Sequence, residues 1–152
     1  DGMVIVTTPQ DVALLDSRKS ITFANSLKVD VIGVIENMSG YTIRGKAPAG
    51  AEIELAAPGG RTVKAQADSD GNWAGTLDIF KSGGGEKTAN EFNVPFLGKL
   101  PFDPGFVRGG DDGVHRIVSE PDGPSSEAFS KVVAKIQERV ESGTTEGGLE
   151  II

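Results

Sequence analysis

The stretch VDVIGVIENMS, residues 29–39, decides the fold class of this chain. Apolar residues and one glycine fill positions 31–35 without a break, so both faces of the segment are apolar. A strand of this kind is typical of a parallel sheet that is covered by helices, because strands with one wet face alternate apolar and polar residues. The sequence therefore predicts a buried parallel strand and an α/β fold.

Before this stretch, MVIVTT (residues 3–8) predicts a second strand buried on both faces. A helix should follow directly, with Thr8 as its N-cap, Pro9 in the first turn and Asp11 near the positive helix end. The helix is expected to run to about Leu27. The apolar residues expected to be buried are Val12, Leu15, Phe23 and Leu27.

After it, VPFLGKLPFD (residues 94–103) predicts a third strand, and GGGEKTANEF predicts a short helix that precedes it. Strand, helix and strand in this order indicate a parallel sheet with flanking helices. A last helix is expected from Pro124 to about Val140. Its apolar stripe consists of Phe129, Val132, Val133, Ile136 and Val140.

Residues 41–77 interrupt this pattern and predict a small antiparallel β insert, called the β insert below. AEIEL, TVKAQA and WAGTLDI alternate apolar and polar residues and are separated by turns, which favours a three-stranded meander. Trp73 should pack over small residues of neighbouring strands. The α/β domain would then comprise residues 1–40 and 78–142, and residues 143–152 would form a flexible tail.

Composition excludes several classes of function. The net charge is −7 and no Lys/Arg block exists, which disfavours nucleic acid and anionic membranes as partners. The apolar runs are too short to span a membrane, so a cytoplasmic protein is expected. There is no cysteine, hence no disulfide and no thiolate metal site. The chain starts without Met in an apolar run, as expected of a piece of a longer protein.

FKSGGGEKT (residues 80–88) raises the question of a phosphate-binding loop. The P-loop pattern G-x-x-x-x-G-K-[ST] requires glycine at two positions before Lys87, and these positions hold Lys81 and Glu86. Glu86 would also place a carboxylate where phosphate oxygens should lie. A turn that caps a helix is therefore favoured over a phosphate site.

Four further features each allow a functional and a plain interpretation. Asn37 follows a parallel strand, where α/β sheets bind ligands, but it could equally cap a turn. His115 stands alone and is expected at the surface. DSDGN (residues 68–72) is more typical of a hairpin turn than of a calcium loop. GGDDG (residues 109–113) could be a mobile acidic loop that touches a partner or Mg²⁺, or a solvated turn.

Together, DGMVIVTTPQDVALLDSRK, VIGVIENMSG, DIFKSGGGEKTANEFNVPFLGKLPFDP and GGDDG resemble the C-terminal half of Mrp/ApbC-type iron-sulfur cluster carriers, P-loop ATPases of the MinD/ParA-like superfamily. The resemblance implies ATP and Mg²⁺ as cofactors and a homodimer. It also implies that Asn37 reads the nucleotide base, and that the loop LPFDP, with Pro101, Phe102 and Asp103, packs beside that base.

Two departures limit what the resemblance implies. The family's P-loop and acidic switch motif belong to its N-terminal half, so ATP and Mg²⁺ are not expected to bind this chain alone. Whether the chain forms part of an active ATPase stays open. The family's CxxC pair is replaced by YTIRGKAPAG and the β insert, which weakly resembles bacterial immunoglobulin-like modules. Without cysteine, an iron-sulfur cluster is not expected here.

The resulting hypothesis is the C-terminal portion of an Mrp-like protein of iron-sulfur cluster assembly or carriage, which supplies the base-side wall of the nucleotide site. The alternative is a non-enzymatic module that binds a protein partner through the β insert. A truncated or engineered chain without its own activity is a third possibility. Half of a sheet would leave an apolar edge exposed, so a complementary chain, self-association or a longer parent protein is expected.

Overall fold

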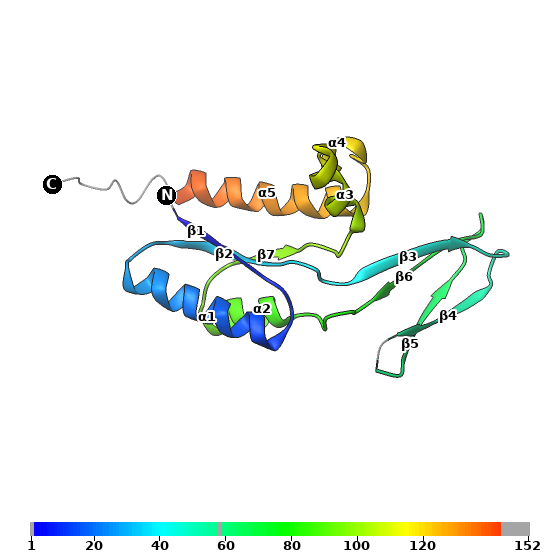
Figure 1. The fold of residues 1–152 in the computed structure, drawn as a ribbon, viewed down its shortest axis with the longest axis horizontal. Coiled ribbons are helices and arrows are strands. Elements are labelled where there is room, and N and C mark those ends of the chain that lie inside the picture. Colours follow the sequence, from blue (N-terminus) through cyan, green and yellow to red (C-terminus); the bar gives the residue numbers. More distant parts are fainter. Residues whose placement is uncertain (1, 58, 144–152) are drawn as a thin grey trace.

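β2 (Val31–Glu36) is the middle strand of a three-stranded parallel sheet, and all six of its residues are buried. Its neighbours are β1 (Met3–Thr7) and β7 (Phe96–Lys99), both parallel to it. The computed structural model describes residues 2–57 and 59–143, and Figure 1 shows this sheet between helical layers, with the β insert projecting beyond it. The predicted α/β fold with a parallel sheet, flanking helices and small antiparallel sheets is confirmed.

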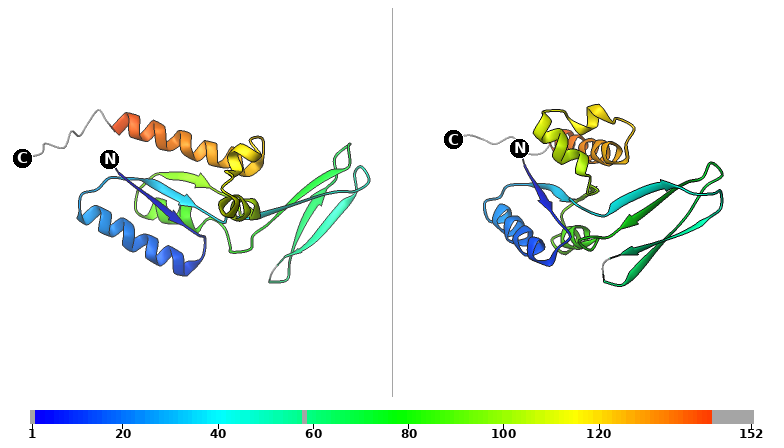
Figure 2. Two further views of the ribbon diagram at one scale, coloured as in Figure 1. Left: turned by 45° about the horizontal axis from the view of Figure 1, so that its top comes forward. Right: turned by 45° about the vertical axis from the view of Figure 1, so that its right-hand side comes forward.

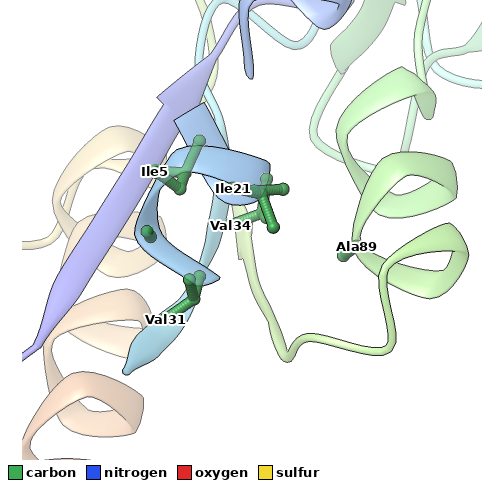
Figure 3. Close-up of a cluster of buried hydrophobic side chains, with 6 residues drawn as sticks. Ile5, Ile21, Val31, Val34 and Ala89 are labelled. Atoms are coloured by element: carbon green, nitrogen blue, oxygen red, sulfur yellow. The ribbon is translucent and has the colours of Figure 1, made fainter. Parts of the chain in front are cut away.

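Helices cover both faces of the sheet, which explains why residues 31–35 of β2 are apolar or glycine. On one face, α1 (Asp11–Ser26) and α2 (Gly84–Glu91) pack against the strands. On the other face lies α5 (Pro124–Gly143), where Val132 packs with Ile35 and Leu97. Figure 3 shows the first of these two cores, in which Ala89 of α2 faces the residues of α1, β1 and β2. The buried residues of this core are Ile5, Ile21, Ala24, Val31, Val34 and Ala89.

Three predictions about the first strand and helix are wrong. β1 is an edge strand, and Val6 is 58% exposed rather than buried. Thr8 is not the N-cap of α1, because the helix begins at Asp11 after Gln10 and the buried Pro9. The helix therefore turns a different face to the sheet. Its buried residues are Leu14, Ser17, Ile21 and Ala24, whereas Val12, Leu15, Phe23 and Leu27 are all more than half exposed.

The C-terminal third contains two short helices before α5. α3 (Pro104–Asp112) includes most of GGDDG, and Gly113 ends it in the left-handed conformation (φ 70°), so the predicted loop is the last turn of a helix. α4 (Arg116–Ser119) follows. On α5, Val132 is buried as predicted, but Val133 and Val140 are exposed since only one narrow stripe meets the sheet. The predicted tail starts inside α5, and residues 144–152 lie outside the described part.

The β insert is not a meander but two stacked antiparallel layers of two strands each. Its strands are β3 (Tyr41–Lys46), β4 (Glu52–Ala57), β5 (Arg61–Gln66) and β6 (Asn72–Leu77). β3 pairs with β6, and β4 pairs with β5, both antiparallel. Figure 2 shows the β3–β6 ribbon leaving the α/β unit and the β4–β5 hairpin folded beside it. The strand β3 was not predicted, although Tyr41, Ile43 and Gly45 alternate in it with the polar residues Thr42, Arg44 and Lys46.

Glycines let the two layers approach closely. A Cβ on Gly75 would lie 2.6 Å from Leu55 Cδ1, so the β4–β5 hairpin sits directly on the ribbon. A Cβ on Gly45 would lie 2.6 Å from the Trp73 ring, which confirms that Trp73 packs over a small residue of the neighbouring strand. The turn at residues 68–72 is held by Asp68, whose Oδ1 accepts the N–H groups of Asp70 and Asn72.

Candidate functional site

The segments that follow β2 and β7 run side by side at the carboxyl edge of the sheet. The N–H of Leu100 donates to Glu36 O at 2.8 Å, and the N–H of Ser39 donates to Leu100 O at 2.9 Å. The N–H of Asn37 donates to Thr7 O at 2.7 Å, which ties the same edge to β1. In open α/β sheets ligands bind outside the carboxyl ends of strands, so this edge is the candidate site.

Asn37 is half-buried at this edge. Its Oδ1 accepts the N–H of Met38 at 2.9 Å, which stabilises the turn after β2. The side chain also lines a groove of about 540 Å³ between β1 and α1, together with Thr7, Thr8 and Ser17. The turn-forming and ligand-facing interpretations of Asn37 are therefore compatible, because the Oδ1 serves the turn and the Nδ2 remains as a donor.

Pro101, Phe102 and Asp103 line a different groove, of about 150 Å³, between β3 and the helices after β7. The structure thus brings the loops after β2 and β7 together, but it does not place all four predicted site residues in one groove. The Phe102 ring makes edge contacts with Tyr41 and Phe80, at centroid distances of 5.8 and 6.4 Å.

Asp103 has a structural role that sequence analysis did not anticipate. Its carboxylate accepts the N–H of Gly105 at 2.8 Å as the N-cap of α3, and Arg116 Nε at 3.0 Å. Burial opposes ionisation of the side chain, but hydrogen bonds from Ser125, Gly105 and Arg116 outweigh it and lower the pKa of Asp103. The carboxylate is therefore ionised at neutral pH, and its oxygens accept hydrogen bonds from Gly105 and Arg116.

The glycine loop before α2 does bind an anion, and that anion is the chain's own Glu36. Glu36 is fully buried, and its carboxylate accepts the N–H groups of Gly83 at 3.0 Å and Gly85 at 2.7 Å. Ser39 Oγ donates to it at 2.6 Å. A helix N-terminus favours negative charge, which explains why a carboxylate can be buried here.

Electrostatics at Glu36 follow from these contacts. Burial alone would raise the pKa of Glu36, but the hydrogen bonds from Ser39, Gly83 and Gly85, together with the charge of Lys99, lower it. Sequence analysis missed this residue. The available signal was a glutamate at the end of an otherwise apolar buried strand, which demands hydrogen-bond donors nearby.

A second near-match to the P-loop pattern lies at residues 40–47, GYTIRGKA, with alanine in place of Ser/Thr. Most of this segment is β3, whose N–H and C=O groups pair with β6. An extended paired strand cannot wrap its N–H groups around phosphates as a P-loop does. The match therefore has no phosphate-binding geometry.

The remaining candidate features are His115 and the acidic segments. His115 is exposed and precedes α4, which confirms the predicted surface position. Within the described part of the chain, no three His, Asp or Glu side chains cluster in a way that could hold a metal ion. None of the helices in residues 2–57 and 59–143 is long and apolar enough to cross a membrane.

Known proteins similar to this chain include several carriers. An iron-sulfur cluster carrier protein of Methanococcus maripaludis is 39% identical over 140 residues, which are 92% of this chain and 38% of that protein. That of Methanocaldococcus jannaschii is 38% identical over 141 residues, 93% of this chain and 39% of that protein. That of Synechocystis is 37% identical over 139 residues, 91% and 32% respectively. The chain thus spans less than two-fifths of these relatives.

Solved structures support the fold. The cell division ATPase MinD of Pyrococcus furiosus matches with a TM-score of 0.54 and 18% identity, over 89% of this chain and 41% of that chain. The septum site-determining protein MinD of Pyrococcus horikoshii, complexed with Mg-ADP, matches with a TM-score of 0.55 and 17% identity, over 95% of this chain and 44% of that chain.

A sequence model described as ParA, NUBPL iron-transfer P-loop NTPase, matches residues 1–70 and 69–137. This match covers most of the chain and, with the carrier relatives, confirms the resemblance to Mrp/ApbC-type proteins. The chain belongs to the ParA family of NUBPL-type iron-transfer P-loop NTPases.

Proposed function

We propose that the chain is the C-terminal portion of an ATP-binding iron-sulfur cluster carrier, and that it supplies the base-side wall of the nucleotide site. The observation that carries this proposal is the similarity, over at least 91% of the chain, to proteins named iron-sulfur cluster carriers. The whole protein would act as a cytoplasmic homodimer with ATP bound near the subunit interface.

Asn37 and the loop at residues 101–103 would form the wall. Both follow parallel strands at the edge where α/β sheets bind ligands. The Asn37 amide can donate from Nδ2 to a ring nitrogen of the base while its Oδ1 keeps the turn. Pro101 and Phe102 offer apolar surface beside it, and Asp103 holds their loop by capping α3.

The phosphates and the cluster do not fit the residues present. The glycine loop is filled by the Glu36 carboxylate, so a phosphate there would meet a like charge in a buried site. The chain has no cysteine, hence no thiolate for an iron-sulfur cluster. In this proposal the phosphates, Mg²⁺ and cluster are held by residues outside these 152, and no step of hydrolysis is assigned to this chain.

Nucleotide titration of the longer protein tests the role of Asn37. Loss of one hydrogen bond to the base in Asn37→Ala should weaken ATP binding by about tenfold, since about 1.4 kcal/mol corresponds to that factor. Asn25→Ala, at an exposed position of α1, is the matched control and should bind as the parent does. Equal affinities for both variants would contradict the proposed wall.

Titration of ATP into the 152-residue chain tests the complementary statement. Because the phosphate contacts are missing, calorimetry should detect no binding tighter than millimolar. Micromolar binding would mean that the chain holds a complete nucleotide site of its own, against this proposal.

A second candidate function is a protein-binding module that uses the β insert. The observation that favours it is the ribbon's outward face, where Arg44 and Lys46 are exposed beside Thr42, Asn72, Ala74 and Thr76. This face carries two cations and no acidic residue on a chain with net charge −7. Such a surface would suit an acidic partner protein.

Excision of the ribbon distinguishes the two functions. Thr42 and Thr76 are paired across the ribbon, so a two-residue Asn-Gly turn can join them in place of residues 43–75. If the shortened protein binds nucleotide but loses a partner in pull-down, the module is supported. Loss of cluster transfer with the same partners retained would support the carrier function instead.

A further inference from the structure

The β insert is joined to the parallel sheet by two connections that meet at one buried side chain. The chain leaves β2 through residues 37–40 and returns from β6 through residues 78–83. Glu36 is the last residue of β2. Its carboxylate accepts the N–H of Gly83, at the end of the returning connection, and the N–H of Gly85, in the first turn of α2. This contact links residues 47 and 49 positions apart.

The same carboxylate also binds the departing connection. Ser39 Oγ donates to Oε1 at 2.6 Å, and Oε1 accepts Gly83 as well, while Oε2 accepts Gly85. Three donors, from the departing connection, the returning connection and the start of α2, thus converge on one anion that is shielded from water. Charge-assisted hydrogen bonds in such surroundings are directional and strong.

Other contacts of the connections go to the loop after β7. The N–H of Ser39 donates to Leu100 O, and the N–H of Phe102 donates to Gly40 O. Tyr41 at the start of β3 and Phe80 after β6 each touch the ring of Phe102 edge-on. The Glu36 carboxylate, by contrast, has hydrogen bonds to both connections, so it can fix the direction of one relative to the other.

We propose that Glu36 is a positioning residue that holds the two ends of the β insert on the parallel sheet, and thereby fixes the direction of the β3–β6 ribbon and the place of Asn37. The statement about the ribbon is independent of the proposed function. The statement about Asn37 rests on it.

The chemistry of the site demands a carboxylate. A glutamine at position 36 keeps the size of the side chain but presents an NH₂ group, a donor, to groups that are themselves donors. At least one of the three hydrogen bonds must then break. Glu36→Gln is thus a minimal change that removes the proposed function of the residue.

Distance measurement between two spin labels tests the ribbon's direction. Because the chain has no cysteine, Lys19→Cys on α1 and Ala74→Cys on β6, both exposed, give a unique label pair. The distance distribution should be narrow in this background and broader or shifted after Glu36→Gln. Glu54→Gln makes the same chemical change at an exposed position of β4 and should leave the distribution unchanged.

A second variant covers the case in which Glu36→Gln does not fold. Gly85→Ala would place a Cβ 2.9 Å from Glu36 Cβ and 3.2 Å from Oε2, and so disturbs the same contact from the other side. The proposal is supported if the distance distribution broadens in a variant that still unfolds cooperatively and is therefore folded. A folded variant of either kind with the parent distribution overturns it.

The Asn37 part is measured in the longer protein. Glu36→Gln should weaken ATP binding several-fold, with Glu54→Gln unchanged. Unaltered affinity in a protein whose ribbon distribution has broadened would overturn only the Asn37 part. If instead Asn37→Ala itself has no effect, the proposed function fails while the ribbon result stands.

Discussion

Thr88 on α2 is a single residue whose environment conflicts with its chemistry. Its Oγ1 is buried, and it has no hydrogen-bond partner among the residues that the structure describes. An unsatisfied buried hydroxyl costs about 1 to 3 kcal/mol relative to a satisfied one. Thr88→Val should therefore raise the free energy of unfolding by about 1 kcal/mol in urea denaturation.

The control for this prediction is Thr22→Val at an exposed position of α1, where the hydroxyl bonds to Arg18 O. Its effect should stay within about 0.5 kcal/mol. A Thr88→Val variant less stable than the parent would show that the hydroxyl is satisfied in solution.

Glu36 gives the stability of the chain a dependence on acid. Burial opposes its ionisation, but hydrogen bonds from Ser39, Gly83 and Gly85 and the charge of Lys99 lower its pKa in the folded state, so its stabilising effect is present above the ordinary glutamate pKa. The effect is lost as the pH falls through the folded pKa. Below about pH 4.3, the ordinary glutamate value, the parent should progressively lose its stability advantage over Glu36→Gln.

Urea denaturation of both proteins between neutral and acidic pH measures this difference. Asp103→Asn serves as a comparison, because the Asp103 carboxyl is also shifted downward and is independent of the Glu36 contacts. A constant difference between parent and Glu36→Gln down to pH 3 would contradict the assigned ionisation.

At the scale of the element, α1 carries two apolar faces, and only one is covered. Ile21 is fully buried, whereas Phe23 is 60% exposed. Hydrophobic periodicity alone could not choose between these faces, since each repeats at three- and four-residue spacing. Packing against the neighbouring elements selects the face that is buried, and this face contains Leu14 and Ile21.

A pair of substitutions tests this assignment. Ile21→Ala leaves a cavity between α1 and the sheet and should cost about 2 to 4 kcal/mol in denaturant unfolding. Phe23→Ala removes a side chain already in solvent and should change stability by less than about 0.5 kcal/mol. Similar costs for the two variants would mean that α1 is rotated relative to the structure described here.

At the scale of the whole molecule, the outer edge of β1 has no strand paired to it among the described strands. β1 pairs only with β2 among the described strands, and the groove of about 540 Å³ runs along it. Exposed strand edges promote pairing with other chains. We expect concentration-dependent self-association of the 152-residue chain, detectable by sedimentation velocity.

Val6→Lys should reduce this self-association, because an edge lysine must bury its charge when another strand pairs. Val118→Lys on α4 changes charge equally at a position 75% exposed and away from the sheet, and should leave association unchanged. If both variants associate less, net charge rather than the β1 edge is responsible.

Much of the fold was predictable from local pattern, but the arrangement of the β insert was not. The unbroken apolar run at residues 31–35 predicted a central parallel strand. Alternation in AEIEL, TVKAQA and WAGTLDI predicted three strands, and β4, β5 and β6 overlap them. Pairing of β3 with β6 is a non-local choice, which short turns do not reveal. The predicted site residues Asn37 and Pro101–Asp103 were located by resemblance, and their separate grooves were visible only in three dimensions.

The sequence by itself determined the class of fold and the family, because buried strands and family motifs can be recognised from runs of consecutive residues. It also determined that the GGG loop is no P-loop, since Lys81 and Glu86 occupy its glycine positions. Only the tertiary structure decided what the loop binds. Glu36 and Gly85 are 49 positions apart, and a local sequence pattern cannot show that the N–H of one donates to the carboxylate of the other.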